Sequence, residues 1–542
     1  MGTSITTRPT STTSAIAVAS LMLFSMFFGA GNLIFPPMLG AESGQGFPFA
    51  IAGFLAAGVL LPVLSVIAVA ITGDDIYDLA QRGGRMFGLL FPVLVYLAIG
   101  AFYALPRTAV VSFSTAVTPL TGFDSTAAAA AFSAVFFAIS LALAFDPSGL
   151  VDKLGKYLTP MLLILLIALV TLSVLTLRSS PTPAIEKYAG HPLSAGLIEG
   201  YLTMDSLAAL AFGIMVISSL RYKGVPSGPK LVRSVGTAAI SAGALLGVIY
   251  IGLGIVGRRI PDALNYEDGA TLLSHAAQST MGFAGMVVFG LIVFLACLST
   301  AAGLIGATSE FFHRIMPGIS YRAWAILFAV ISLAVSTLGL ETVLAIAAPI
   351  IGFLYPAAIT LVSLTLIEPV FRRKLHYTFL FSLAVAVFWA ALMTVSSIGW
   401  ATTVVDPLID WAPMHGQKLG WVVPTLIAII AGYTADLILR PTRAVPVGGE
   451  HQLEAELRSG HWDSEALEEA VITHHPDDIA AVNAPDANHA LDVISHRINV
   501  IERERTETAA RLEALDEAKE LAEQHAEELR DATDKQLKPN QH

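Results

Sequence analysis

The run from Phe27 to Pro37 places small, polar and helix-breaking residues inside an otherwise apolar segment. It reads Phe-Phe-Gly-Ala-Gly-Asn-Leu-Ile-Phe-Pro-Pro. Glycine weakens a helix, and proline lacks the amide hydrogen that a helix requires. A helix interrupted here exposes carbonyls at one end and amides at the other, which suit a cation and a carboxylate respectively. An ion and amino-acid site is one interpretation, and close helix packing through small residues is the other.

A second apolar segment contains the run Glu199-Gly200-Tyr201-Leu202-Thr203-Met204-Asp205-Ser206. Carboxylates inside a membrane are costly and mark substrate or ion pathways. We expect Glu199 to be hydrated at the outer interface and Asp205 to lie within the membrane. Interrupted segments at corresponding positions in two halves of a chain are typical of inverted-repeat transporters.

Two further positions carry polar groups within apolar surroundings. Ser299 and Thr300 offer adjacent hydroxyls that either bind a hard monovalent cation or bond back to carbonyls of their own helix. Arg107 either extends its side chain to the outer interface or faces an entry vestibule. The single cysteine, Cys297, excludes an internal disulfide framework.

These motifs belong to a chain of 542 residues that is 55% hydrophobic and 13% charged, whereas soluble domains carry about a quarter charged residues. We therefore predict an all-α, polytopic membrane protein and exclude soluble enzymes. We see no nucleophile–base pair, metal cluster or phosphate loop that would indicate a membrane enzyme. Because a span needs about 20 apolar residues, twelve spans are predicted, near 16–39, 48–71, 87–112, 127–145, 157–177, 197–220, 231–256, 282–308, 322–338, 342–366, 377–400 and 419–439.

The basic residues in the predicted loops indicate the orientation. With the N-terminus inside, sixteen Lys or Arg residues fall in the inner loops and six in the outer loops. Cytoplasmic loops carry the excess of basic residues, so both termini are predicted to be cytoplasmic. The predicted organisation is a cytoplasmic N-terminus over 1–15, a membrane domain over 16–440 and a tail over 441–542.

The tail differs from the rest of the chain in composition. From Pro441 onward it holds 10 Lys or Arg and 23 Asp or Glu, a net charge of −13, against −11 for the whole chain. A helix is predicted from about residue 494, with a weak heptad pattern between Ile494 and Leu529. This pattern indicates either self-association through a coiled coil or a solvated amphipathic helix.

The first motif resembles the signature of the bacterial branched-chain amino-acid:cation symporters, and the similarity covers roughly residues 15–440. Pro106-Arg107-Thr108, the run 199–205 and the Ser299-Thr300 region resemble that family as well. The resemblance implies a LeuT-type fold, with inverted repeats at about 16–177 and 197–366 and extra helices at 377–400 and 419–439. It also implies a multi-pass protein of the bacterial inner membrane.

The resemblance further implies two sets of site residues. Sodium would be bound by carbonyls of Ser25, Phe28 and Ala296 and by the hydroxyls of Ser299 and Thr300. The substrate would contact Gly29, Ala30, Gly31, Asn32, Tyr201, Thr203, Asp205 and Ser206. Sodium is the expected coupling ion, and we expect no cofactor and no nucleic-acid partner.

The function that follows is sodium-coupled uptake of leucine, isoleucine and valine by alternating access. One alternative keeps the fold but couples to protons or transports another neutral amino acid, since Asp205 offers a titratable group. A second alternative is a membrane sensor or scaffold that signals through its acidic tail.

Overall fold

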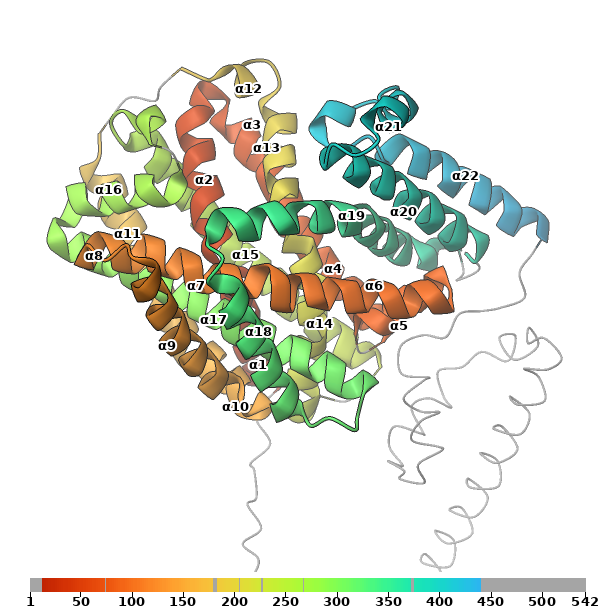
Figure 1. The fold of residues 1–542 in the computed structure, drawn as a ribbon, viewed down its shortest axis with the longest axis horizontal. Coiled ribbons are helices and arrows are strands. Elements are labelled where there is room, and N and C mark those ends of the chain that lie inside the picture. Colours follow the sequence, from red (N-terminus) through yellow and green to blue (C-terminus); the bar gives the residue numbers. More distant parts are fainter. Residues whose placement is uncertain are drawn as a thin grey trace, which may run out of the picture. The chain divides into compact units, whose positions relative to one another are not determined.

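A computed structural model describes residues 12–73, 75–178, 183–203, 205–225, 228–266, 268–371 and 375–439, which form helices and their connections (Figure 1). The chain divides into two compact units, and all described residues belong to the first, which comprises 1–441 and 445–473. The tail, with its predicted helix from about residue 494, lies outside the described residues.

The helices follow one another along the chain with short connections. They are α1 Thr12–Phe27, α2 Ala30–Glu42, α3 Phe47–Leu55, α4 Leu61–Thr72, α5 Ile76–Ala80, α6 Arg85–Leu97, α7 Ala104–Ser112, α8 Thr118–Thr121, α9 Thr126–Ala144, α10 Pro147–Asp152, α11 Thr159–Thr176, α12 Glu186–Ala189, α13 Pro192–Leu202, α14 Asp205–Tyr222, α15 Pro229–Arg259, α16 Gly269–Met281, α17 Phe283–Ile315, α18 Tyr321–Ser336, α19 Leu340–Ile367, α20 Tyr377–Ser397, α21 Thr402–Ile409 and α22 Val422–Leu439.

The structure gives a smaller number of membrane spans than the twelve predicted. By length and composition, ten helical stretches of the described chain can cross a membrane, or eleven if the bent pair α1 and α2 counts as one span. The segment predicted at 322–338 corresponds to α18, an apolar helix of 16 residues. Its length falls below the roughly 20 residues that a straight span needs, so twelve spans are not confirmed.

Both predicted interruptions appear as breaks between helices. The first separates α1, which ends at Phe27, from α2, which begins at Ala30, and the two axes differ by 71°. The second separates α13, which ends at Leu202, from α14, which begins at Asp205. Pro36 and Pro37, which were expected to contribute to the first break, instead lie within α2.

The helix α1 lies in the interior of the bundle. It packs against α14, α15 and α17, and Phe24, Phe28 and Tyr250 form a continuous stack of rings on its buried side. Elsewhere small residues bring backbones together, as at α13 and α3. There a Cβ on Gly196 or Gly200 would collide with carbonyl groups of the facing helix. Close approach through small residues is the usual packing mode of membrane helices.

The last helices, α20 to α22, lie together at one side of the bundle (Figure 1). Asp436 of α22 joins two of them, because its carboxylate accepts hydrogen bonds from the amides of His376, Tyr377 and Thr378 and from the Thr378 hydroxyl. These groups stand at the first turn of α20, whose free amides need acceptors. The carboxylate therefore caps one helix and ties it to its neighbour.

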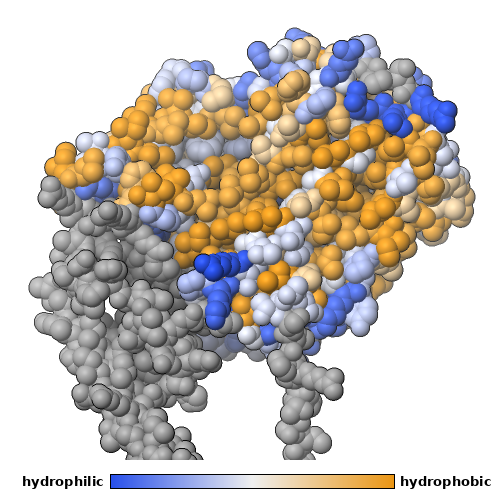
Figure 2. Space-filling model, turned by 180° about the vertical axis from the view of Figure 1, so that it is seen from behind, coloured by the Kyte–Doolittle hydropathy of each residue, from blue (hydrophilic) through white to orange (hydrophobic). Residues whose placement is uncertain are grey.

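The outer surface of the helical unit is apolar. Figure 2 shows hydrophobic residues over most of one face, with hydrophilic residues gathered along its edges. Side chains such as Val135, Ile164, Val248 and Ile430 are each at least 60% exposed. An apolar exterior of this extent suits contact with lipid rather than water.

Candidate functional site

A cavity of about 90 Å³ lies where the two helix breaks meet α7, α17 and α19. Its polar wall comes from both breaks and from α7 and α17. Its lining residues are Met26, Phe27, Gly29, Gly31, Asn32, Ile99, Tyr103, Ala104, Arg107, Thr108, Thr203, Asp205, Leu207, Ala208, Phe212, Thr300, Leu304 and Ile351.

Asn32 connects the first break to the second. Its Oδ1 accepts a hydrogen bond from the amide of Gly29 (3.2 Å), and its Nδ2 donates to Oδ2 of Asp205 (2.8 Å) and to the Tyr250 hydroxyl. The side chain is 5% exposed. A buried amide must find partners for both of its ends, and here those partners fix the position of Asp205 relative to α2.

Arg107 reaches the same cavity from α7. The chain passes through a π-helical turn, Ala98–Phe102, immediately before α7, and such turns redirect the side chains that follow. The Arg107 guanidinium donates from Nη1 to the Tyr103 hydroxyl (2.7 Å) and lies over the Tyr103 ring. A Cβ on Gly31 would stand 3.4 Å from Nη2 of Arg107. Of the two orientations considered from sequence, the structure shows the one that faces inward.

The remaining wall is apolar. It is built from Phe27, Ile99, Phe212, Leu304 and Ile351, which approach from α1, the turn before α7, α14, α17 and α19. The ring centroids of Phe27 and Phe212 lie 6.0 Å apart. A pocket with a few convergent polar groups on one side and an apolar remainder is the usual form of a small-molecule site.

Beside this cavity, hydroxyls of α17 meet the end of α1. Ser299 Oγ donates to the carbonyls of Ser25 (3.0 Å) and Ala296 (3.1 Å). Thr300 Oγ1 lies 3.4 Å from the Ser25 carbonyl and 3.3 Å from that of Met26. Because α1 stops at Phe27, its last carbonyls have no intrahelical partner. The structure thus places four of the five residues predicted for sodium next to one another, and Ser299 bonds to both its own helix and α1.

The residues predicted for the substrate divide into two groups. Gly29, Gly31, Asn32, Thr203 and Asp205 line the cavity. Tyr201 and Ser206 are not among the lining residues. The Tyr201 ring packs edge-on against Tyr355, and the Ser206 hydroxyl forms a hydrogen bond with the Ser65 hydroxyl (2.7 Å).

Three other residues that the sequence singled out are Ala30, Phe28 and Glu199. Ala30 is the first residue of α2. Phe28 lies at the break, with its ring stacked on Phe24. Glu199 forms an ion pair with Lys187, whose side chain is 42% exposed.

Sequence reasoning missed part of the site. Tyr250 contributes its hydroxyl from the middle of α15, 218 residues from its partner Asn32. The apolar wall was not assigned to particular residues either. A tyrosine within a long apolar helix gives no local signal, since Tyr also packs as an ordinary core residue.

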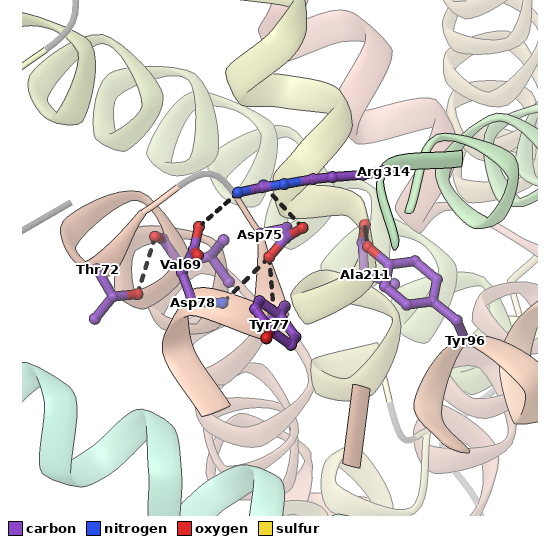
Figure 3. Close-up of polar contacts among 8 residues, drawn as sticks. All are labelled: Val69, Thr72, Asp75, Tyr77, Asp78, Tyr96, Ala211 and Arg314. Carbon is purple, nitrogen blue, oxygen red and sulfur yellow. Dashed lines mark hydrogen bonds and ion pairs between the residues drawn. The ribbon is translucent and has the colours of Figure 1, made fainter. Parts of the chain in front are cut away.

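A second polar cluster surrounds Asp75 at the start of α5 (Figure 3). Asp75 Oδ1 accepts hydrogen bonds from the amides of Tyr77 (2.8 Å) and Asp78 (3.2 Å) at the start of α5, and Oδ2 pairs with Arg314 Nη1 (2.9 Å). Oδ2 of Asp78 pairs with Nη2 of Arg314 (3.3 Å). Burial raises the pKa of Asp75 to about 6 despite the opposing effect of Arg314.

Comparison with known proteins shows similarity over almost the whole membrane domain. Residues 12–438 match the family described as branched-chain amino acid transport protein. The permease BrnQ of Corynebacterium glutamicum is 52% identical over 422 residues, which cover 78% of this chain and 95% of that protein. The permease BraB of Bacillus subtilis is 33% identical over 429 residues, covering 79% and 96%. Both are named branched-chain amino acid permeases, which confirms the prediction of a transporter rather than an enzyme.

Solved structures share the fold. A transporter of the nucleobase-cation-symport-1 family, in a closed conformation with bromovinylhydantoin bound, aligns with a TM-score of 0.53 at 15% identity, over 80% of this chain and 94% of that one. A Na⁺-coupled sialic acid symporter aligns with a TM-score of 0.52 at 13% identity, over 78% and 90%. At such identities the likeness concerns the fold alone, and it confirms the predicted all-α membrane class of LeuT type.

Proposed function

The chain belongs to the branched-chain amino acid transport protein family, and we propose that it is a secondary transporter that carries leucine, isoleucine and valine into the cell together with sodium. The observation that carries the proposal is that both helix breaks end on one cavity. In secondary transporters such breaks form the binding sites for substrate and ion.

The proposed substrate class agrees with the chemistry of the cavity wall. Its polar groups gather at Asn32, Arg107 and Asp205, and an apolar wall lies beside them. This division suits a small amino acid with charged main-chain groups and a branched aliphatic side chain. Burial of such a side chain contributes about 1.5–3 kcal/mol. The relatives named as branched-chain amino acid permeases support the same class.

We assign the sodium site to the junction of α1 and α17. Carbonyls of Ser25, Phe28 and Ala296 and the hydroxyls of Ser299 and Thr300 are the proposed ligands. The contacts of Ser299 and Thr300 with the end of α1 support four of these five. Oxygen ligands of this kind suit a hard cation.

Coupling requires that the ion favour one conformation. A cation bound between α1 and α17 would fix the position of α1 and hence of Gly29 and Asn32 at the cavity. The ion would then increase affinity for the substrate, and by linkage the substrate would increase affinity for the ion by the same factor. Inward and outward access to one site would alternate around this ternary complex.

Proton coupling is the second candidate, and the position of Asp205 favours it. This carboxylate faces the cavity and bonds to Asn32, so a proton there would change the substrate site directly. Intramembrane carboxylates act as proton carriers in other transporters.

Uptake of labelled isoleucine into proteoliposomes that contain the purified chain distinguishes sodium coupling from proton coupling. Accumulation that requires an inward sodium gradient supports sodium symport. Accumulation driven by a pH gradient and indifferent to sodium supports the proton-coupled alternative. If no branched-chain amino acid enters under either gradient, the proposed function is wrong.

A further inference from the structure

We propose that the cavity recognises its ligand as a zwitterion through two side chains of opposite charge. In this arrangement the Arg107 guanidinium binds the ligand carboxylate and the Asp205 carboxylate binds its ammonium group. The inference rests on the proposed transport of amino acids and adds the residues and the orientation by which the amino acid is held.

Arg107 has unused binding capacity. Its guanidinium makes one hydrogen bond, to Tyr103, and forms no ion pair with any carboxylate of the described residues. Its Nε is buried and has no hydrogen-bond partner. A guanidinium carries five N–H donors in a planar fork that matches a carboxylate. The absence of Cβ at Gly31 leaves room beside this fork.

Asp205 forms no ion pair among the described residues either, and the Arg107 charge acts on it only from a distance. The hydrogen bond that it accepts comes from the neutral side chain of Asn32, and no basic residue of the described chain forms an ion pair with it. A buried carboxylate without a cation loses hydration without full compensation. An ammonium group carries the opposite charge and has three N–H donors, so it can donate hydrogen bonds to this carboxylate.

The two charges face the same cavity but do not meet. Tyr103 holds the guanidinium on the α7 side, while Asn32 holds the carboxylate on the α14 side. If Arg107 and Asp205 were a structural ion pair, direct contact would be the favourable arrangement, because unpaired buried charges are costly. Their separation across the cavity leaves space for a ligand that carries one charge of each sign.

This placement leaves the side chain of the ligand for the apolar part of the cavity. With the carboxylate at Arg107 and the ammonium at Asp205, the apolar lining to which Phe27, Phe212 and Leu304 belong is available to the aliphatic side chain. Both charges of the ligand are satisfied by side chains, so affinity depends on each of them separately.

The test uses ligands from which one charge has been removed. L-Leucine carries both charges, L-leucinamide with a protonated amine lacks the carboxylate, and 4-methylpentanoate lacks the amine. Binding of each to the purified full-length chain in detergent is measured by titration calorimetry for the wild type, Arg107→Gln and Asp205→Asn. Arg85→Gln and Asp124→Asn are the matched controls, because both residues are exposed.

We expect the wild type to bind leucine at least about 30-fold more tightly than either truncated ligand, as for loss of a buried charge pair. In Arg107→Gln the preference for leucine over leucinamide should disappear, while the preference over 4-methylpentanoate remains. In Asp205→Asn the reverse should hold. The two controls should behave as the wild type.

Three outcomes separate the possibilities. If the wild type binds leucine and each variant keeps both preferences, the charge assignment is wrong while the proposed function stands. If the wild type binds no branched-chain amino acid, the proposed function fails first. If Arg107→Gln is not monodisperse, the same ratios are measured with Arg107→Lys and with Gly31→Ala, whose Cβ would occupy the space beside the guanidinium. In both variants leucine should lose more affinity than leucinamide, and an unchanged ratio overturns the proposal.

Discussion

Two aspartates of this chain, the buried Asp75 and the partly buried Asp205, stand at similar places in the fold but have different surroundings. Each lies at the start of a helix, α5 and α14 respectively. Asp75 is bound by two backbone amides and by Arg314, as Figure 3 shows. Asp205 is bound by the neutral side chain of Asn32 and faces a cavity.

The difference separates structure from binding. Where protein groups satisfy a carboxylate, as at Asp75 and again at Asp436, its role is to hold helices in place. Where a carboxylate makes no direct ion pair and borders open space, the protein tolerates a cost that a ligand can relieve. Membrane depth alone therefore does not identify a functional acid, and the set of partners around it does.

Replacing each aspartate by alanine should produce the largest contrast. Asp205→Ala should reduce isoleucine uptake by roughly 100-fold, because a buried charge pair with the substrate is lost, while the thermal unfolding midpoint changes little. Asp75→Ala should lower the free energy of unfolding by about 1 kcal/mol through loss of the helix cap. Its uptake per folded molecule should stay near that of the wild type. Equal loss of uptake in both variants would break the comparison.

Removal of the side chain that positions Asp205 should give a smaller effect. Asn32→Ala leaves the Asp205 carboxylate in place but removes the amide that donates to it and that is itself held by Gly29 and Tyr250. Loss of a hydrogen bond to a charged group costs about 1.5–3 kcal/mol, so substrate affinity should fall roughly tenfold or more, with little change in folding. Calorimetric titration with isoleucine measures this. Failure of the variant to reach the membrane would make Asn32 a structural residue.

The ion site offers a third comparison, between hydroxyls near the α1 break and a hydroxyl elsewhere. Ser299→Ala combined with Thr300→Ala should raise the sodium concentration for half-maximal uptake about tenfold, since two oxygen ligands are lost. Ser382→Ala is the matched control. Its buried hydroxyl bonds to the carbonyls of Thr378 and Phe379 within its own helix α20. Sodium activation that is the same in all three proteins would remove the ion from this junction.

Local features of the site could be predicted, and long-range features could not. The breaks at Gly29 and before Asp205 follow from residues within a few positions of each other, because glycine and an intramembrane acid act locally. The contact of Tyr250 with Asn32 depends on how α15 packs against α2, and no short pattern encodes that packing. For Arg107 the sequence allows two orientations, and it gives no sign of the π-helical turn Ala98–Phe102 that precedes α7.

The fold shows the same division. Membrane class and the order of the apolar segments follow from composition, but the number of spans does not. Whether the 16 residues of α18 cross the membrane depends on tilt and neighbours rather than on hydropathy. Pro36 and Pro37 were expected to interrupt the first segment and are accommodated within α2, since neighbouring helices can satisfy the backbone groups that proline frees.

The smallest expected effect is the pH response of the Asp75 cluster. The pKa of Asp75 is raised from 3.8 to about 6, chiefly by burial, so between about pH 4 and 6 the folded protein binds this proton more readily than the unfolded chain. Its contribution to stability is therefore present at low pH and lost as pH rises through 6. The thermal midpoint of the wild type relative to Asp75→Asn should fall between pH 5 and pH 7. A constant difference would mean that Arg314 keeps Asp75 ionised throughout this range, and the contrast between the two aspartates would then be sharper.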